Sequence, residues 1–264
     1  SSPNSAKELH VGHLRSTIIG ESIARVLEFI GHHTLRLNHV GDWGTQFGML
    51  IGYLKKFQQD VLHGKIEPNL SDLMRWYRES KKIFDEDLSF KKMAQQEVVA
   101  LQNLEPSSMQ AWERICDISR KAFQEIYTLL DVSLQERGES FYHPMLKGVV
   151  DDFEKKKMIQ IDAGAKCVFL PGFQGKEEEP LPMILQKSDG GFNYSTTDMA
   201  AIKQRALVEK ADRIIYVVDA GQSLHFQMIF KAAEQVGYVD PKKVELNHVA
   251  FGVVLGSDGK KFKT

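Results

Sequence analysis

Apolar residues recur at helical spacing directly after a polar N-terminal stretch. They are Ile19, Ile23, Val26, Leu27 and Ile30. This spacing places them on one face of a helix, and Gly31 is a typical residue for the C-cap of that helix. Leu35 and Leu37 then alternate with polar neighbours, which is typical of a strand over residues 33–38. The start of the chain therefore predicts an extended segment, a helix and a strand.

A long helical region follows. Residues 47–57 predict a helix and residues 60–70 an exposed loop. Over residues 71–131 the apolar positions recur at helical spacing in three groups, and the tryptophans among them are expected in the core. The groups are Leu73, Trp76 and Tyr77; Phe90, Met93 and Val98; and Trp112, Ile115, Ile118 and Phe123. Ser107, which follows Pro106, is the predicted N-cap of the third helix.

Two short strands and an exposed loop come next. Residues 158–162 and 167–170 predict strands, and Gly164 lies in the turn between them. The charged residues 176–179 predict a loop on the surface. We therefore predict a mostly helical insertion with a small hairpin over residues 71–180.

Strand signals return after this predicted insertion. Residues 183–187 predict a strand that resumes the sheet, residues 195–209 a helix, and residues 213–219 the most clearly buried strand of the chain. A loop then leads into a helix that ends near Val236, and residues 244–251 predict a last strand. This order of strands and helices predicts an α/β fold with a parallel sheet.

Ligands of such folds bind beyond the carboxyl ends of the parallel strands. The loop over residues 38–48 lies at one such end, and its glycines, Asp42 and Trp43 suit the rim of a pocket. A well-packed turn with Trp43 in the core is the alternative. Gln222 and His225 are expected at the same edge of the sheet, since they follow the buried strand.

Composition and charge narrow the class of protein. Of the 264 residues, 42% are hydrophobic and 26% are charged, which is ordinary for a globular protein with a large core. Lys and Arg number 34 against 35 Asp and Glu, so the chain as a whole lacks the basic excess of a nucleic-acid-binding protein. Cys116 and Cys167 stand apart, which excludes a zinc knuckle and suits a reducing compartment. No apolar run approaches a membrane span, and no signal segment is expected.

The start of the first predicted helix carries candidate chemistry. His10 and His13 flank Gly12 where the extended segment becomes a helix. A helix N-terminus has unpaired N–H groups and partial positive charge, so it binds phosphate well. Two imidazoles would add donors for a nucleotide, and Gly12 would let a base or ribose lie against the backbone. The simpler interpretation is that one histidine caps the helix and the other lies in a turn.

Several separated blocks resemble the arginyl-tRNA synthetase family. Residues 2–16, SPNSAKELHVGHLRS, resemble the opening of these enzymes, in which HVGH is the HIGH signature of class I synthetases. Residues 37–48, LNHVGDWGTQFG, resemble a further family block, and similar segments recur near Asp198, near Gln222 and at the C-terminus. The resemblance therefore covers nearly the whole chain and implies a Rossmann-like nucleotide-binding catalytic domain. Residues 1–70 and 181–264 would be its two halves.

The resemblance also implies an activity. The family activates L-arginine with ATP to arginyl-adenylate and transfers it to tRNA(Arg), releasing AMP and pyrophosphate, so this chain is expected to be a ligase of protein biosynthesis. Mg²⁺ would arrive with ATP, without a dedicated metal site on the protein. His10, Gly12 and His13 would bind the ATP phosphates, and the catalytic set implied is His10, His13, Lys7, Lys261 and Lys263.

Lys261 and Lys263 belong to a stretch that resembles the mobile KMSKS loop in a degenerate form. The second lysine of that signature is absent, with Thr264 at or beside its place, and Lys7 matches a family position that compensates for it. A cation just before His10 would reach the same phosphates. The alternative is that Lys7 is simply solvated.

The arginine and adenine contacts are likewise implied residue by residue. Tyr194 and Asp198 match the family's Y-x-x-x-D, whose aromatic ring and carboxylate contact the arginine side chain, and at i and i+4 of a helix they face the same way. The remaining arginine-binding positions are Ser2, Asn4, His13 and Gln222. For adenine the family positions are Gly252, Val253, Val254 and His248. Without the resemblance, Asp198 would be an ordinary acid at a helix start.

The expected partners are L-arginine, ATP, tRNA(Arg) and other synthetases in a complex. No membrane partner is expected, and the expected location is the cytoplasm. Two rival functions stay open at this point. Another H-x-G-H nucleotidylyltransferase would share the phosphate chemistry but has no reason to contain residues 37–48 or the Tyr194 and Asp198 pair. An inactive paralogue that serves as a binding scaffold is the second rival.

Overall fold

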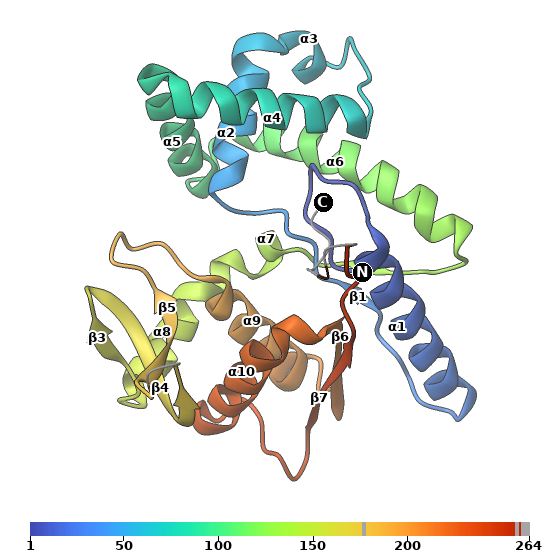
Figure 1. Cartoon of the computed structure of the whole chain (residues 1–264), viewed down its shortest axis with the longest axis vertical. Coiled ribbons are helices and arrows are strands. Elements are labelled where there is room, and N and C mark those ends of the chain that lie inside the picture. Colours follow the sequence, from blue (N-terminus) through green and yellow to red (C-terminus); the bar gives the residue numbers. More distant parts are fainter. Residues whose placement is uncertain (176–177, 257–258, 260–264) are drawn as a thin grey trace. The chain divides into compact units, whose positions relative to one another are not determined.

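The computed structural model describes residues 1–175, 178–256 and 259, and Figure 1 shows the whole chain. It divides into two compact units, Ser1–Ser140 and Phe141–Thr264. The predicted division into residues 1–70, 71–180 and 181–264 does not coincide with these units and stays a prediction. Within the described part, no helix has both the length and the apolar composition needed to cross a membrane.

Unit 1 begins with the predicted helix, α1 (Val11–Phe29). Its C-cap is Ile30, and Gly31 follows at φ +95°. The amide of Gly31 donates to the Glu28 carbonyl at 2.9 Å and that of His32 to the Leu27 carbonyl at 3.0 Å. This is a Schellman motif, which needs a left-handed residue directly after the C-cap. The prediction that the helix ends at Gly31 is confirmed, but Gly31 lies one position beyond the C-cap rather than at it.

The predicted helical region of unit 1 is also present. Its helices are α2 (Thr45–Phe57), α3 (Gln59–Leu62), α4 (Leu70–Glu86), α5 (Leu88–Gln102) and α6 (Pro106–Leu129). α2 contacts α4, α5 and α6, and its residues Phe47, Leu50, Ile51 and Leu54 are buried against them. Figure 1 shows these helices packed side by side in unit 1. Trp76 lies in this core as predicted, whereas Trp112 is only partly buried at its edge.

Two local predictions in this region were wrong. Residues 60–70 are not wholly a loop, since α3 covers the first of them. Ser107 is not an N-cap, because the cap of α6 is Glu105 and Pro106 begins the helix. Proline suits the first helical position, where its missing N–H would have no intrahelical partner, so the helix starts earlier than Ser107.

Strand pairing in unit 1 is short and parallel. β1 (Leu37–Asn38) pairs with β2 (Gln135–Glu136), a strand that the sequence pattern did not predict. A parallel bridge between Asn4 and Gly41 continues beyond the carboxyl end of β1. The short helix α7 (Glu139–Tyr142) follows β2. The N-terminal stretch is thereby tied to the end of a parallel strand, as an α/β fold requires.

Unit 2 contains an antiparallel sheet of three strands. After η1 (His143–Met145) and α8 (Leu146–Lys155) come β3 (Gln160–Asp162), β4 (Ala165–Gln174) and β5 (Pro180–Gln186). The predicted hairpin is confirmed as β3 and β4. The strand expected over residues 183–187 is β5, but it pairs antiparallel with β4 and does not resume the parallel sheet. Because β4 and β5 are neighbours in sequence, a short connection suffices for this antiparallel pairing.

The rest of unit 2 is a parallel β–α–β arrangement preceded by a helix. Its elements are α9 (Tyr194–Lys203), the π-helical η2 (Gln204–Val208), β6 (Arg213–Asp219), η3 (Ala220–Gln222), α10 (Ser223–Val236) and β7 (Glu245–Phe251). β6 and β7 pair in parallel along their whole length, from Arg213 opposite Glu245 to Asp219 opposite Phe251. The expected α/β class is thus confirmed, and the predicted strand over residues 213–219 has the bounds of β6.

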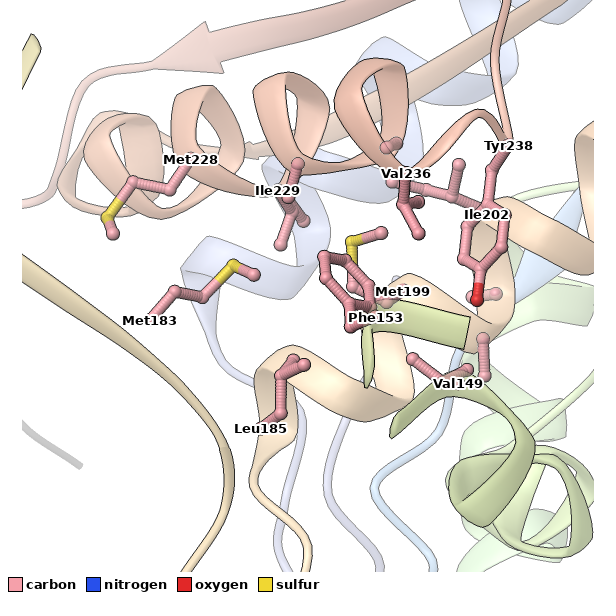
Figure 2. Close-up of a cluster of buried hydrophobic side chains, with 14 of the residues drawn as sticks. Val149, Phe153, Met183, Leu185, Met199, Ile202, Met228, Ile229, Val236 and Tyr238 are labelled. Atoms are coloured by element: carbon pink, nitrogen blue, oxygen red, sulfur yellow. The ribbon is translucent and has the colours of Figure 1, made fainter. Parts of the chain in front are cut away.

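The core of unit 2 lies between helices and the antiparallel sheet. Figure 2 shows Phe153 of α8, Leu185 of β5, Met199 of α9 and Ile229 of α10 pointing toward one another. All four are fully buried, and each such side chain contributes roughly 1.5–3 kcal/mol. The second half of α9, from Met199 to Ile202, has no exposed surface. This packing fixes α9, so the first turn of the helix is held in place at the edge of the core.

Candidate active site

The two histidines of the H-x-G-H motif cap α1 reciprocally. His10 is the N-cap, and its Nδ1 accepts a hydrogen bond from the Gly12 amide at 3.0 Å. The amide of His10 in turn donates to Nδ1 of His13, at 3.1 Å. The ring centroids lie 3.9 Å apart. The motif is therefore the helix cap of the simpler interpretation, but with both histidines engaged in it.

This cap determines where the hydrogen of each ring lies. A backbone N–H can donate only to an unprotonated ring nitrogen, so both rings carry hydrogen on Nε2 when neutral. Burial and the neighbouring His10 lower the pKa of His13 to about 4, which keeps His13 neutral at physiological pH. The start of α1 thus offers two Nε2–H donors, together with the partial positive charge of a helix N-terminus, whereas the backbone N–H groups of His10 and Gly12 are used in the cap itself.

Gly12 is required by the cap itself. A Cβ at this position would lie 2.8 Å from Cε1 and 3.0 Å from Nδ1 of His10. Real Cβ atoms do not come that close, so a side chain here would push the imidazole away from its backbone donor. The predicted contact of Gly12 with a base or ribose stays a prediction. Its first function is to make room for the His10 ring.

Ser2 and Asn4 lie where the N-terminal stretch meets the carboxyl end of β1. The Ser2 amide donates to Oδ1 of Asn38, the last residue of β1, at 2.7 Å. The amide of Gly41 donates to the Pro3 carbonyl at 2.9 Å, and a Cβ on Gly41 would lie 2.0 Å from Oδ1 of Asn4. Both side chains are placed by backbone contacts at a sheet edge where ligands of α/β folds bind. Lys7 is exposed between them and His10.

The predicted loop over residues 38–48 is shorter in the structure, since only residues 39–44 connect β1 to α2, and it is more buried than a pocket rim. Asp42 is 4% exposed and accepts hydrogen bonds from the amide of Ser140 at 2.8 Å and from its hydroxyl at 2.6 Å. Burial raises the pKa of the Asp42 carboxyl, and the Ser140 bonds oppose that rise. Nε1 of Trp112 donates to the Asp42 carbonyl at 2.6 Å, and Trp43 packs edge-on against Trp112. These contacts favour the alternative interpretation, a well-packed turn, at Asp42 and Trp43.

In unit 2, Tyr194 and Asp198 lie around a third residue. Asn193 caps α9, so Tyr194 begins the helix and Asp198 lies one turn later. Nε2 of His225 lies 2.7 Å from Oδ2 of Asp198, and the His225 ring centroid is 4.9 Å from that of Tyr194. Tyr194 is 58% exposed, whereas the side chain of Asp198 is 20% exposed. An aromatic face and a partly buried carboxylate together suit a guanidinium group.

His225 was not among the predicted binding residues. The sequence did place it near the carboxyl edge of the sheet, because it follows β6 by a few residues. No local pattern connects it with Asp198, which lies 27 residues earlier. Gln222, predicted to bind arginine, ends the short turn η3 and is exposed. Oδ1 of Asp219 accepts the Gly221 amide at 3.0 Å and holds this turn.

The predicted adenine-binding residues lie along and after β7. His248 is in the middle of this strand, and its Nε2–H donates to the Val218 carbonyl of β6 at 3.0 Å. Its ring centroid lies 4.6 Å from that of Phe226. Gly252, Val253 and Val254 follow the last residue of β7, at the carboxyl end of a parallel strand. Their contact with adenine stays a prediction.

The predicted set is therefore divided between the units. Lys7, His10, Gly12, His13, Ser2 and Asn4 belong to unit 1, and Tyr194, Asp198, Gln222, His248 and residues 252–254 belong to unit 2. Lys261 and Lys263 lie outside the described residues. No group of three His, Cys, Asp or Glu side chains suited to a metal ion occurs within residues 1–175, 178–256 and 259. The arrival of Mg²⁺ with ATP stays a prediction.

Comparison with known proteins agrees with the resemblance over the whole chain. A family model described as the catalytic domain of class I tRNA synthetases (R) matches residues 1–264. The arginine--tRNA ligase of Protochlamydia amoebophila is 61% identical over 264 residues, which cover all of this chain and 45% of that protein. The cytoplasmic arginine--tRNA ligase of Xenopus tropicalis is 56% identical over 264 residues, or 39% of its length.

A solved structure is similar as well. The crystal structure of arginyl-tRNA synthetase from Plasmodium falciparum superposes with a TM-score of 0.84 and 42% identity, over 96% of this chain and 42% of that one. The chain thus spans less than half the length of these relatives.

Proposed function

Since the chain belongs to the family of class I arginyl-tRNA synthetase catalytic domains, we propose that it activates L-arginine with ATP and transfers the product to tRNA(Arg). The observation that carries this proposal is the pair of histidines that cap α1 and hold two Nε2–H donors at a helix N-terminus. The two histidines would donate hydrogen bonds to the oxygens of a triphosphate. The matched relatives carry the name arginine--tRNA ligase, which supports arginine as the amino acid.

The proposed first step forms arginyl-adenylate. A carboxylate oxygen of arginine attacks the α-phosphorus of ATP, the bond between the α-phosphorus and its bridging oxygen breaks, and pyrophosphate leaves with Mg²⁺. In the second step a ribose hydroxyl at the end of tRNA(Arg) attacks the arginyl carbonyl, and AMP leaves. Such phosphoryl chemistry depends on positioning and on charge stabilisation.

His10 and His13 would act in the first step as neutral hydrogen-bond donors. Because their rings are held by the backbone of α1, little reorganisation is needed when phosphate binds. Full positive charge would come from Mg²⁺ and from Lys7, which is exposed just before His10. We propose Lys261 and Lys263 as further phosphate contacts, by their match to the KMSKS loop.

Arginine would be recognised by the residues around the start of α9. The Asp198 carboxylate would pair with the guanidinium, and the exposed ring of Tyr194 would lie along it. Gln222, Ser2, Asn4 and His13 are the further arginine contacts in this proposal. For ATP we propose that His248 and the backbone of residues 252–254 hold the adenine ring.

The proposal also covers the location of the protein in the cell and its macromolecular partners. A cytoplasmic location is supported by the Xenopus tropicalis relative, whose name includes it. We also propose tRNA(Arg) as a macromolecular partner and other synthetases as partners in a complex. Family membership weighs against the rival H-x-G-H transferases, and the retained His10, His13 and Asp198 weigh against an inactive scaffold.

Pyrophosphate exchange tests the proposed function directly. The longest natural chain that contains residues 1–264 would be assayed with each amino acid, with and without total tRNA. We expect ATP–pyrophosphate exchange with arginine alone among the amino acids, and an increase when tRNA is added. Exchange with another amino acid, or absence of both exchange and calorimetric arginine binding under every condition, would overturn the proposal.

A further inference from the structure

His225 is the hydrogen-bond donor that the structure gives to the Asp198 carboxylate. It is the third residue of α10, and its Nε2 lies 2.7 Å from Oδ2 of Asp198 on α9. Carboxylate oxygens accept, so Nε2–H donates to Oδ2, and among the described residues the second carboxylate oxygen remains for another partner. The two side chains are 15% and 20% exposed, so water is largely kept from the bond.

The His225 ring is itself held in position on two sides. Its centroid lies 4.9 Å from that of Tyr194 and 5.5 Å from that of Phe226. Phe226 is 6% exposed and packs on Tyr216 of β6 at 4.8 Å and on His248 of β7 at 4.6 Å. These ring contacts, one with the exposed Tyr194 and one with the buried Phe226, restrict the imidazole and favour one direction for its hydrogen bond.

Arg205 is a cation on the same helical segment as Asp198, and it contacts other side chains. Arg205, in the η2 segment that continues α9, is 8% exposed, and its guanidinium lies 5.2 Å from the centre of the Tyr216 ring. One of its terminal nitrogens donates to the Tyr142 hydroxyl at 3.5 Å. Arg205 is therefore engaged with Tyr216 and Tyr142, whereas His225 makes the direct contact with Asp198.

A neutral donor has an advantage over a cation at this point. A lysine or arginine bonded to Asp198 would neutralise the carboxylate and compete with a cationic ligand. An N–H donor orients the carboxylate, and a neutral donor would leave its charge available. Orientation matters because a guanidinium binds a carboxylate through two parallel N–H bonds, which need the carboxylate plane in one direction.

We propose that His225 is a positioning residue for arginine recognition, which orients the Asp198 carboxylate toward the guanidinium without neutralising it. This inference rests on the proposed function, in which Asp198 contacts arginine. It predicts that arginine affinity depends on a neutral donor at position 225, whereas ATP affinity and the rate at saturating arginine depend on it much less.

Three substitutions at one position test the proposal in the longest natural chain that contains these residues. His225→Gln places an amide N–H near the position of Nε2 and should keep the KM for arginine within about threefold. His225→Leu removes the donor and should raise that KM roughly tenfold or more, with the KM for ATP unchanged, because a hydrogen bond to a charged group is lost. His225→Lys keeps a donor but adds a cation, and should raise the KM for arginine at least as much as His225→Leu.

Controls separate this inference from the proposed function. Gln227→Leu, two residues further along α10 and exposed, should leave every parameter unchanged. Asp198→Asn tests the arginine site itself: if it leaves the KM for arginine unchanged, the proposed site fails and the inference fails with it. If Asp198→Asn abolishes arginine binding while His225→Leu, shown to be folded by its melting temperature, binds arginine like the wild type, only the inference about His225 is overturned. A kcat loss with unchanged KM in His225→Leu would also overturn it.

Discussion

The histidines of the two units are held by opposite means. His10 and His13 of unit 1 are bonded within one helical turn, through the backbone amides of His10 and Gly12. His225 and His248 of unit 2 are bonded to partners 27 and 30 residues away, on other elements. The first pair is positioned by local backbone geometry, so its Nε2–H groups remain available as far as residues 1–175, 178–256 and 259 are concerned. The second pair is positioned by tertiary packing, so its Nε2–H groups are already used.

The largest effect is expected at His10, where the cap and the Nε2–H donor can be separated. Asparagine is a good N-cap whose Oδ1 can replace the acceptor Nδ1, but it has no counterpart of Nε2–H. We expect His10→Asn to keep the helix, and to lower the rate of adenylate formation by roughly 10²- to 10³-fold, as for loss of a preorganised donor. Single-turnover adenylate formation measures this effect, with the melting temperature as control. A variant with unchanged rate would show that His10 is only a cap.

Gly12 provides the next largest effect. Its added Cβ would meet the His10 ring at 2.8 Å, so Gly12→Ala should displace the imidazole without removing it. We expect a loss of roughly 10- to 100-fold in kcat/KM for ATP, because misplacing a catalytic group by about 1 Å costs that much.

The matched control for this change is Gly148→Ala in α8. A Cβ there has no atom within 4 Å, so helix stability should rise by about 0.5–1 kcal/mol with no change in rate. Equal kinetic losses in the two variants would contradict the argument for Gly12.

A substitution at His248 tests whether the second pair of histidines stabilises the tertiary structure. His248→Leu removes the donor to the Val218 carbonyl between β6 and β7, while an apolar side chain remains beside Phe226. We expect the free energy of unfolding to fall by about 1–2 kcal/mol. Urea denaturation measures it, and His248→Gln, which keeps an N–H donor, should recover most of the loss. A stability loss for His10→Asn as large as for His248→Leu would break the distinction between the two pairs.

The smallest expected effect concerns pH. The pKa of His13 is lowered from 6.5 to about 4 in the folded chain, so below pH 6.5 the unfolded chain binds more protons than the folded one. Stability should therefore fall as the pH decreases from 6.5 toward 4, by up to about 1 kcal/mol from this residue after allowance for solvent screening. The urea midpoint of the wild type should fall over this range relative to that of His13→Asn. Parallel pH profiles for the two proteins would contradict the lowered pKa of His13.

Much of the fold was predicted correctly from the spacing of apolar residues and from residues that are typical of turns and helix ends. The sequence patterns agree with the bounds of β6, with the helical region of unit 1 and with the start of α1 behind His10. They do so because these elements depend on contacts within a few residues. The strand β2 is only two residues long and lies on an irregular stretch, so its pattern was too short to recognise. β5 was recognised as a strand but assigned to the wrong sheet, because its partner depends on pairing rather than on its own sequence.

By itself, the sequence determined the helix cap at His10, Gly12 and His13, since every interaction in that cap lies within one turn and depends on residue types at fixed spacing. Only the tertiary structure decided that Asp198 would be bonded to His225 and that Asp42 would be bonded to Ser140. Those partners come from elements that meet through burial of apolar faces, a driving force that is not directional and leaves no mark on the spacing of the polar residues it brings together.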